Sequence, residues 1–411
     1  MARPNVTITK LNGGLGGTVT SKDGVSLLVI SVDSTAYALG SSSYTGIQLS
    51  DFESQGFTKA KDLSNNVLVW EHIKDFYTLA PAGTELHVLV IPATTTFTQL
   101  FTVANANYLA LQTYLTSKKS LIKLLGVALN PSAAETAPTA GISADLIAAI
   151  PLAQAFADNE FAKFRPIDML LEGRKFTAAT MSAATDLRTK LSPNISVMIS
   201  RDGARQAELV ASGHTGSANY AAVGFALGRL AGISVQVNIG RRKDGAIGWT
   251  NAHLSAGQQV VLLSDADLDA LSDKGYLFVT QDTGQEGFFF NDDPTCAALD
   301  NDYCYITRNR VINKAARIAR QVYVQELLDE VSVDKDTGEL SALTIKTFED
   351  AIKTAIEDQM IEIGEADAID VYINPDQNVL ANSTIEILIQ IQPKGYARFL
   401  NVKLKLVNPN T

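Results

Sequence analysis

The sequence predicts an α/β core followed by a C-terminal part in which helices and strands are mixed. Between residues 84 and 200, short apolar runs rich in β-branched residues alternate with longer stretches of helical spacing. This alternation is typical of βαβ units and a mostly parallel sheet. In the last third, two amphipathic helical stretches precede strands in which apolar and polar residues alternate. The 411 residues are enough for more than one hydrophobic core.

The first 83 residues predict an extended arm and a small β-rich region that packs with the C-terminal domain. The arm opens on four residues that alternate apolar and polar side chains: Val6, Thr7, Ile8 and Thr9. Such alternation places the two apolar side chains on one face of a strand. Residues 25–32 form a continuous apolar run that predicts a buried strand, whereas residues 33–80 predict less regular structure.

The middle of the chain, residues 84–260, is expected to form a separate α/β domain. Its predicted strands are 86–91, 121–129, 167–171 and 195–199, and its predicted helices are 97–116, 144–161, 178–190 and 218–231. The last of these helices is dense in Ala, Gly and Leu. Small residues of this kind indicate close packing against a sheet or another helix.

The last part, residues 261–411, is expected to form a second domain that ends in another arm. A hairpin is predicted at 276–280 and 287–290, helices at 308–331 and 344–361, and strands at 369–373, 384–392 and 399–407. In the terminal strand Val402, Leu404 and Leu406 alternate with lysines. Together with Phe399 they form a strand that needs a sheet edge to join, because an unpaired edge is an aggregation hazard.

Composition excludes several classes of protein. The 34 Lys and Arg against 44 Asp and Glu give a formal net charge of −10, which argues against a nucleic-acid partner. No signal peptide is recognisable, and no window reaches the roughly 20 apolar residues of a membrane helix. Cys296 and Cys304 are too few for a disulfide framework, so we expect reduced thiols in a protein made in a cytoplasm.

No motif indicates a cofactor, a metal or a catalytic residue. The glycine cluster lacks the lysine of a phosphate loop and the spacing of a dinucleotide fold. It is interpreted as a hinge, together with a glycine near the C-terminus: Gly13, Gly14, Gly16, Gly17 and Gly395. The four histidines have no metal-site spacing. Asp265, Asp267 and Asp269 resemble the start of a calcium loop, but Ser264 with Asp267 fits a helix N-cap better.

The helix predicted at 308–331 carries a basic face. At 100° per residue, one side of this helix holds Arg310, Lys314, Arg317 and Gln321. A solvated surface is the simple explanation. Because the chain is acidic overall, we also expect that this face contacts an acidic partner.

The last third resembles the C-terminal domain of phage tail sheath proteins. The segments that carry the likeness are 309–314, 369–375 and 385–393. Residues 4–8, the glycines at 13–16 and the small-residue helix at 221–232 are similar to a divergent branch of sheath-like proteins from phages and contractile systems. The likeness lies in the order of elements over roughly the whole chain.

The resemblance implies a structural protein and no enzyme. Sheath subunits assemble as stacked hexameric rings, a helical polymer, around an inner tail tube protein, with baseplate and terminator proteins at the ends. By this likeness the domain at 261–411 faces the tube, the domain at 84–260 lies outside, and the two arms pair with sheets of neighbouring subunits. The tube contact would then fall on Arg310, Lys314, Arg317 and Gln321.

The same resemblance implies a virion tail or phage-like particle, synthesised and assembled in the bacterial cytoplasm without contacting nucleic acid or membrane directly. Two other functions remain open. One is a soluble α/β enzyme or ligand-binding protein that uses the crevice at the strand ends. The other is a different virion component such as a baseplate protein.

Overall fold

The computed structural model describes residues 22–33, 37, 43–131 and 135–405. The chain divides into two compact units, and the boundary falls between Gln321 and Val322. No helix within the described residues is both long enough and apolar enough to cross a membrane. We call the two parts the larger unit and the smaller unit.

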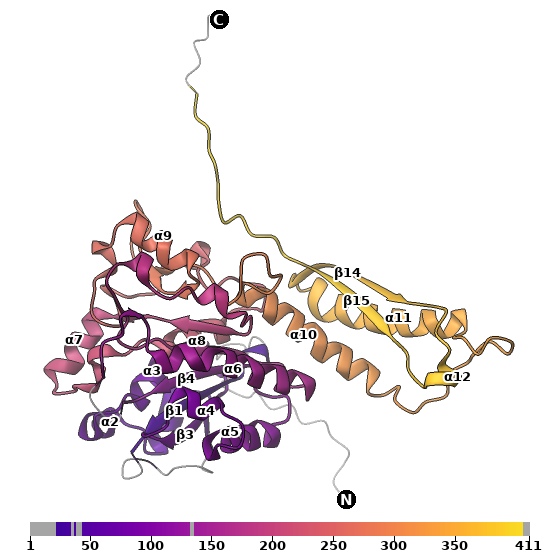
Figure 1. Cartoon of the computed structure of the whole chain (residues 1–411), viewed down its shortest axis with the longest axis horizontal. Helices are drawn as coiled ribbons and strands as arrows, with labels where there is room; N and C mark the ends of the chain where they lie inside the picture. Colours follow the sequence, from indigo (N-terminus) through magenta and orange to yellow (C-terminus); the bar gives the residue numbers. More distant parts are fainter. Residues whose placement is uncertain (1–21, 34–36, 38–42, 132–134, 406–411) are drawn as a thin grey trace, which may run out of the picture. The chain divides into compact units, whose positions relative to one another are not determined.

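The larger unit is built on a seven-stranded sheet with the strand order β11-β8-β6-β4-β1-β3-β2 (Figure 1). All neighbours pair in parallel except β2 and β3. The strands are β1 (Ser26–Val32), β2 (Ser43–Gly46), β3 (Leu86–Pro92), β4 (Leu124–Leu129), β6 (Asp168–Glu172), β8 (Ile195–Met198) and β11 (Tyr276–Leu277). Every residue of β1 is buried, as expected for a central strand covered on both faces. The predicted, mostly parallel α/β fold is therefore confirmed.

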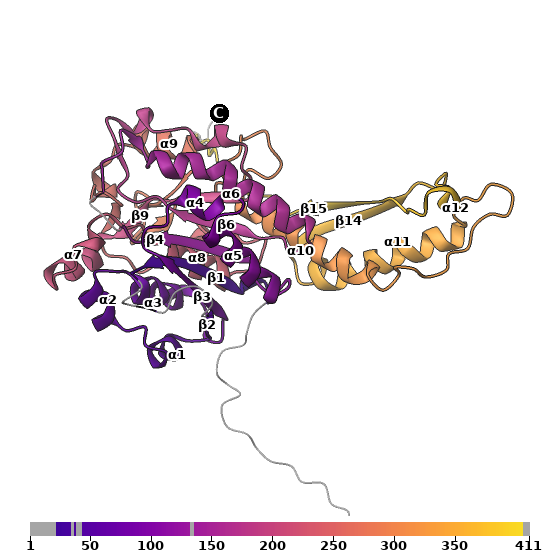
Figure 2. The same ribbon diagram turned by 60° about the horizontal axis from the view of Figure 1, so that its bottom comes forward.

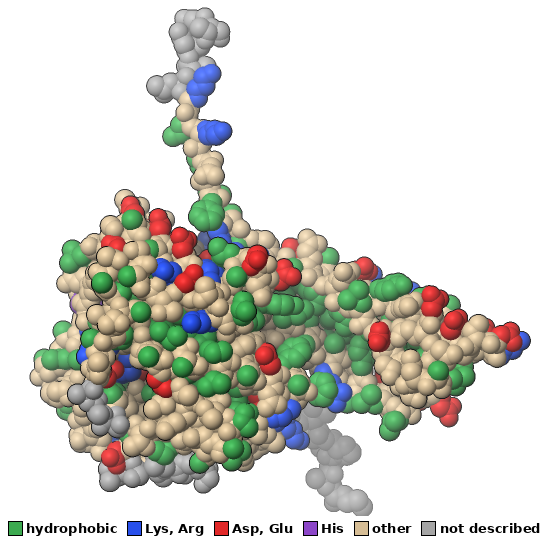
Figure 3. Space-filling model, in the orientation of Figure 1, with side chains coloured by type: hydrophobic (Ala, Val, Ile, Leu, Met, Phe, Trp, Pro, Cys, Tyr) green, Lys and Arg blue, Asp and Glu red, His purple; other side chains and the backbone are tan. Residues whose placement is uncertain are grey.

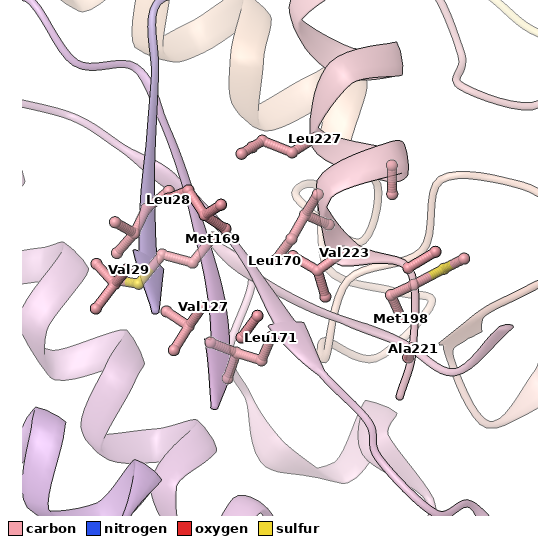
Figure 4. Close-up of a cluster of buried hydrophobic side chains, with 14 of the residues drawn as sticks. Leu28, Val29, Val127, Met169, Leu170, Leu171, Met198, Ala221, Val223 and Leu227 are labelled. Carbon is pink, nitrogen blue, oxygen red and sulfur yellow. The ribbon is translucent and has the colours of Figure 1, made fainter. Parts of the chain in front are cut away.

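Helices cover this sheet. Those of the larger unit are α1 (Leu49–Ser54), α2 (Lys59–Asn65), α3 (Val69–Leu79), α4 (Phe97–Phe101), α5 (Ala106–Ser117), α6 (Ala144–Ala162), α7 (Gly203–Ala211), α8 (Val223–Gly232), α9 (Asp265–Asp273) and α10 (Ile306–Tyr323). Val223 and Leu227 of α8 point toward Leu28 of β1 and Leu170 of β6 (Figure 4). Helix α3 packs on α8 and forms a second layer.

Short pairings complete the larger unit. Antiparallel pairs join β9 (Ser200–Asp202) to β10 (Ala252–Leu254), β12 (Val279–Thr280) to β13 (Phe289–Phe290), and β5 (Ala140–Gly141) to β7 (Thr177–Ala178). The predicted hairpin near 280 is thus formed, although β11 next to it joins the main sheet.

The expected domain boundaries at 83 and 260 differ from the division of the structure. Strand β1 pairs with both β3 and β4, so the first part of the chain belongs to the same sheet as the middle. Strand β11 extends the other end of that sheet, which draws residues after 260 into the larger unit. The region 33–80, predicted to be less regular, also holds the three helices α1 to α3.

The helix predicted at 178–190 is wrong. In its place are two 3-10 turns at Met181–Ala183 and Leu187–Lys190. Between them, both the backbone N–H and the hydroxyl of Thr185 donate to the carbonyl of Ala140. A threonine bound to a distant segment in this way competes with helix formation.

The smaller unit combines one long helix with a hairpin. Its elements are α11 (Ala342–Ile356), a π-helical turn (Glu357–Ile361), β14 (Ala366–Ile373), α12 (Val379–Asn382) and β15 (Ile387–Pro393). Helix α11 and the two strands run alongside one another in both views (Figures 1 and 2). Ile352, Ile356 and Met360 are buried between them. After β15, residues 394–405 have no regular structure, so the strand predicted at 399–407 is not formed in its described part.

Candidate assembly surfaces

The β14–β15 hairpin of the smaller unit has an inner and an outer face. Its register pairs Val371 with Ile389 and Tyr372 with Leu388. The first pair is half-buried, whereas Tyr372 and Leu388 are each 53% exposed. An apolar cross-strand pair left in solvent is the kind of surface that a further protein element covers.

Both edges of this hairpin are open within the described chain. In the sheet topology β14 pairs with β15, and no other strand joins them. The edges of a sheet present N–H and C=O groups that are a template for another strand, although the N–H of Ile373 in β14 donates to Glu349 of α11 at 3.2 Å. The smaller unit therefore presents two places for strand addition.

The C-terminal segment 394–405 has no regular structure, but its composition suits a strand. Phe399, Val402 and Leu404 are 88%, 77% and 93% exposed. The segment carries four cations and no acid, whereas residues 322–393 hold sixteen Asp and Glu against three Lys. Figure 3 shows green and blue side chains along this segment, and red acidic side chains on the smaller unit. The segment and the unit are therefore complementary in charge.

Exposed apolar side chains are concentrated in the smaller unit. Among the described residues, twelve exposed large hydrophobic side chains fall in this unit and twelve in the much longer larger unit. A monomer rarely leaves so much apolar surface open unless it binds a partner there. The smaller unit is thus the better candidate for an interface.

The other predicted arm residues cannot be placed. Val6, Thr7, Ile8, Thr9 and Leu406 lie outside the described residues, as do Gly13, Gly14, Gly16 and Gly17. Gly395 is described, and no heavy atom lies within 4 Å of the position that a Cβ would occupy. Its role as a hinge stays a prediction.

The basic face of α10 is not a solvent-facing surface, which corrects the expected tube contact. Arg310 is 3% exposed and donates to the carbonyl of Ile233 at 3.0 Å. Lys314 and Arg317 form ion pairs with Asp23 at 2.9 and 3.0 Å. Only Gln321 of the predicted set is exposed. The cations are held inside the unit because a carboxylate and a carbonyl of the same chain face them.

The carboxyl end of the parallel sheet is occupied by the chain's own charges. Glu172 at the end of β6 is buried and accepts from the backbone N–H groups of Leu129 and Ala221. Arg174 joins Glu172 to Glu135 at 3.1 and 2.8 Å. Burial raises the pKa of Glu172 to about 7 although Arg174 opposes this shift. Each of these groups therefore binds other atoms of the same chain.

Sequence reasoning missed this cluster. Glu172 and Arg174 follow the predicted strand at 167–171 directly, and Glu135 stands alone in a loop of small residues. Charged residues directly after a predicted parallel strand are recognisable in a sequence, because they indicate side chains at the edge of the sheet where the carboxyl ends of the strands meet. Their pairing with Glu135 was not predictable, because it joins residues 39 apart across a loop.

Other predictions about chemistry concern single residues. The N-cap at Ser264 is confirmed, since its hydroxyl accepts from the backbone N–H of Asp267 at 3.2 Å. Cys296 and Cys304 are buried and unbridged. Within the part of the chain that is described, no group of three or more His, Cys, Asp or Glu side chains is placed to hold a metal ion.

Comparison with known proteins identifies relatives of the whole chain. The family model described as DUF2586, N-terminal domain, matches residues 3–294, and the one described as DUF2586, C-terminal domain, matches residues 302–411. No curated protein matches the sequence.

Several solved structures share the fold over almost the full length. A chain from the contracted helical sheath of the anti-feeding prophage is 14% identical, with a TM-score of 0.61 over 98% of this chain and 99% of that one. A chain from the baseplate of that prophage is 13% identical, with a TM-score of 0.59 over 99% and 100%. A sheath tail protein from Desulfitobacterium hafniense is 9% identical, with a TM-score of 0.51 over 95% and 100%. At these identities the likeness shows a common fold.

Proposed function

The chain belongs to the DUF2586 family in both its N-terminal and C-terminal parts, and we propose that it is a structural subunit of a contractile tail sheath. It polymerises with itself as stacked hexameric rings around an inner tube protein, and baseplate and terminator proteins close the polymer. Its place is a virion tail or a phage-like particle assembled in the bacterial cytoplasm. The fold shared with the anti-feeding prophage sheath and baseplate chains supports this role.

The observation that carries the proposal is an open hairpin together with an exposed, apolar C-terminal segment in the same chain. β14 and β15 leave two unpaired edges, and residues 399–405 are exposed and unpaired. Strand addition from one copy to the hairpin of another satisfies both sets of backbone groups. The opposite charges of the segment and of the smaller unit favour that pairing.

The residues that we assign to this contact are Phe399, Val402 and Leu404, with Leu406 beyond the described part. The N-terminal residues Val6, Thr7, Ile8 and Thr9 are proposed as a second arm of the same kind. Glycines at 13, 14, 16, 17 and 395 supply bends at the roots of the arms. A polymer linked in this way changes its length while each copy stays attached.

Catalysis is not part of the proposal. Contraction would release energy stored when the polymer assembles, so no nucleotide would be consumed. ATP hydrolysis that copurifies with wild-type polymers, and is lost when one residue is changed, would contradict this statement.

The proposal is tested by deleting residues 397–411 and examining the protein by negative-stain electron microscopy. We expect wild-type protein to form long striated tubes and the truncated protein to stay monomeric. Its melting temperature should match that of the wild-type monomer, because no regular pairing holds the segment in the isolated chain.

A double variant distinguishes the effect of the apolar side chains from the effect of removing the whole segment. Val402→Ser with Leu404→Ser removes the apolar face of the segment and should block tubes, whereas Asn401→Ser on the other face should not. Normal tubes from the truncated chain would refute the strand addition. A small, monodisperse wild-type particle under all conditions would refute the sheath function itself and favour a binding protein.

A further inference from the structure

Asp23 ties the beginning of the described chain to helix α10. It lies in the 3-10 turn Lys22–Gly24, directly before β1. Its two carboxylate oxygens face Lys314 at 2.9 Å and Arg317 at 3.0 Å. The three side chains are between 13% and 15% exposed, so water screens these ion pairs less than it would on an open surface.

The turn that carries Asp23 is fixed by its backbone as well. A Cβ on Gly24 would lie 2.3 Å from the carbonyl oxygen of Ala231 at the end of α8. The hydroxyl of Ser26 donates to the carbonyl of Gly24 at 2.9 Å. Gly24, the residue after Asp23, is therefore held close to α8 and to the start of β1.

Helix α10 is anchored on the larger unit at further points. Arg310 donates to Ile233, and Asn313 donates to the buried carboxylate of Asp168 at 3.0 Å. One turn beyond Arg317, the guanidinium of Arg320 lies 4.0 Å from the ring centre of Phe164. The helix continues to Tyr323 and so runs across the boundary at 321.

We propose that Asp23 is a positioning residue that couples the N-terminal arm to α10, the helix that leads into the smaller unit. This inference rests on the proposed sheath function, in which the arm before Asp23 binds a neighbouring subunit. A pull on the arm then acts on α10 through Lys314 and Arg317. Without the carboxylate, the same pull would act on β1, an interior strand of the sheet.

The same contact explains why α10 needs basic residues although they do not face solvent. Lys314 and Arg317 are one turn apart, and together they hold both oxygens of one carboxylate. Lys123 lines the same small cavity as Asp23 and Arg317. Several cations thus line this cavity, and Asp23, in the first turn of the described chain, is one of its two acids beside Asp168.

The test compares Asp23→Arg with a matched control. Asp244 also bridges two cations, Arg229 and Arg241, and its side chain is 15% exposed. We expect Asp23→Arg and Asp244→Arg to lower the melting temperature of the monomer similarly. Only Asp23→Arg should lower the yield of tubes, by about tenfold, which corresponds to a change near 1.4 kcal/mol. Hydrogen exchange at residues 22–26 should become faster in Asp23→Arg alone.

A charge swap provides the rescue. Asp23→Arg combined with Lys314→Asp and Arg317→Asp restores opposite charges and should recover tubes, and Asp23→Asn serves if the arginine variant does not fold. Normal tube yield in both Asp23 variants, or equal loss in the Asp244 control, would overturn the coupling role. Wild-type protein that forms no tubes would instead refute the sheath function, while the exchange data would still report whether Asp23 holds the turn.

Discussion

At the scale of single residues, several carboxylates are buried in the larger unit. Asp62 accepts from the hydroxyl of Tyr37 at 3.2 Å and from the backbone N–H of Glu71 at 3.1 Å. Burial raises the pKa of Asp62 to about 7, although these hydrogen bonds oppose the shift. In the unfolded chain this carboxyl has its ordinary pKa of about 4, so it is ionised above that pH. Between these values the folded state holds more protons, so the contribution of Asp62 to stability falls as the pH rises.

This shift predicts the behaviour of Asp62→Asn. The amide stays neutral, and it is able to accept from Glu71 and donate to Tyr37. The free energy of unfolding of Asp62→Asn, relative to that of wild type, should therefore increase between pH 5 and pH 7 by up to about 1.4 kcal/mol per pH unit. Above pH 7 the difference should remain constant. Urea denaturation at pH 5, 6, 7 and 8 measures this difference.

Asp244→Asn is the control for the pH series. Nearby arginines hold the pKa of Asp244 below its usual range, so the carboxylate is ionised in both states from pH 5 to 8. The control should show a constant difference from wild type over this range. A constant difference for Asp62→Asn as well would contradict the raised pKa.

What the sequence reveals at this scale depends on the range of the interaction. The cap of Ser264 on Asp267 spans three residues and was predictable from the pattern. The burial of the basic face of α10 was not predictable, because Asp23, which pairs with Arg317, lies 294 residues away in the sequence. Periodicity shows which side chains share a helix face, but the fold decides whether that face meets water or a carboxylate.

At the scale of elements, the contact between α3 and α8 depends on glycine. A Cβ on Gly224 would lie 2.1 Å from the carbonyl oxygen of His72, and one on Gly228 would lie 2.2 Å from that of Phe76. Gly232 repeats the spacing at the next turn, 2.8 Å from the carbonyl oxygen of Leu79. Spacing by four residues puts the three glycines along one face, so the backbones of the two helices touch.

Gly228→Ala should therefore destabilise the protein despite the better helix propensity of alanine. Pushing α3 away from α8 costs about 1–3 kcal/mol, which exceeds the roughly 1 kcal/mol that alanine gains in a helix. Thermal and urea unfolding of the monomer measure the effect. Gly395→Ala is the matched control and should be neutral, because open space surrounds that position.

Elements with a strong apolar pattern were predictable, and those without one were not. Strands β1, β3, β4, β6 and β8 were found within a few residues of their observed bounds, as were α6 and α11. Close packing of α8 was also expected from its small residues. The strand predicted at 399–407 is not formed in its described part, residues 399–405, although apolar and polar side chains alternate there.

At the scale of the whole molecule, charge is divided unevenly. The segment 394–405 is basic, and residues 322–393 are strongly acidic. If the segment of one copy binds the smaller unit of another, salt should weaken the polymer, because the Debye length falls from about 30 Å at 0.01 M to about 3 Å at 1 M.

Lys403→Glu with Lys405→Glu should reverse this salt dependence. The variant should form few tubes at low salt, where like charges repel, and more tubes as salt screens them. Sedimentation of polymers across a salt series measures the effect, with Lys335→Glu as a control in an exposed turn of the smaller unit. Tube yields that are equal for variant and wild type at every salt concentration would exclude an electrostatic contribution from these lysines.

The interior position of β1 in the sheet also has a consequence for how the larger unit forms. Its first residue pairs with Leu86 on one side and with Leu124 on the other, so both neighbours come from distant parts of the chain. Closing such long loops before any pairing is gained slows folding, and contacts of this range are typical of domains that fold slowly. Until they form, an uncharged run of seven residues, Ser-Leu-Leu-Val-Ile-Ser-Val, is open to other chains. Such a run is prone to aggregation, so low temperature and dilute protein should favour the native yield during refolding.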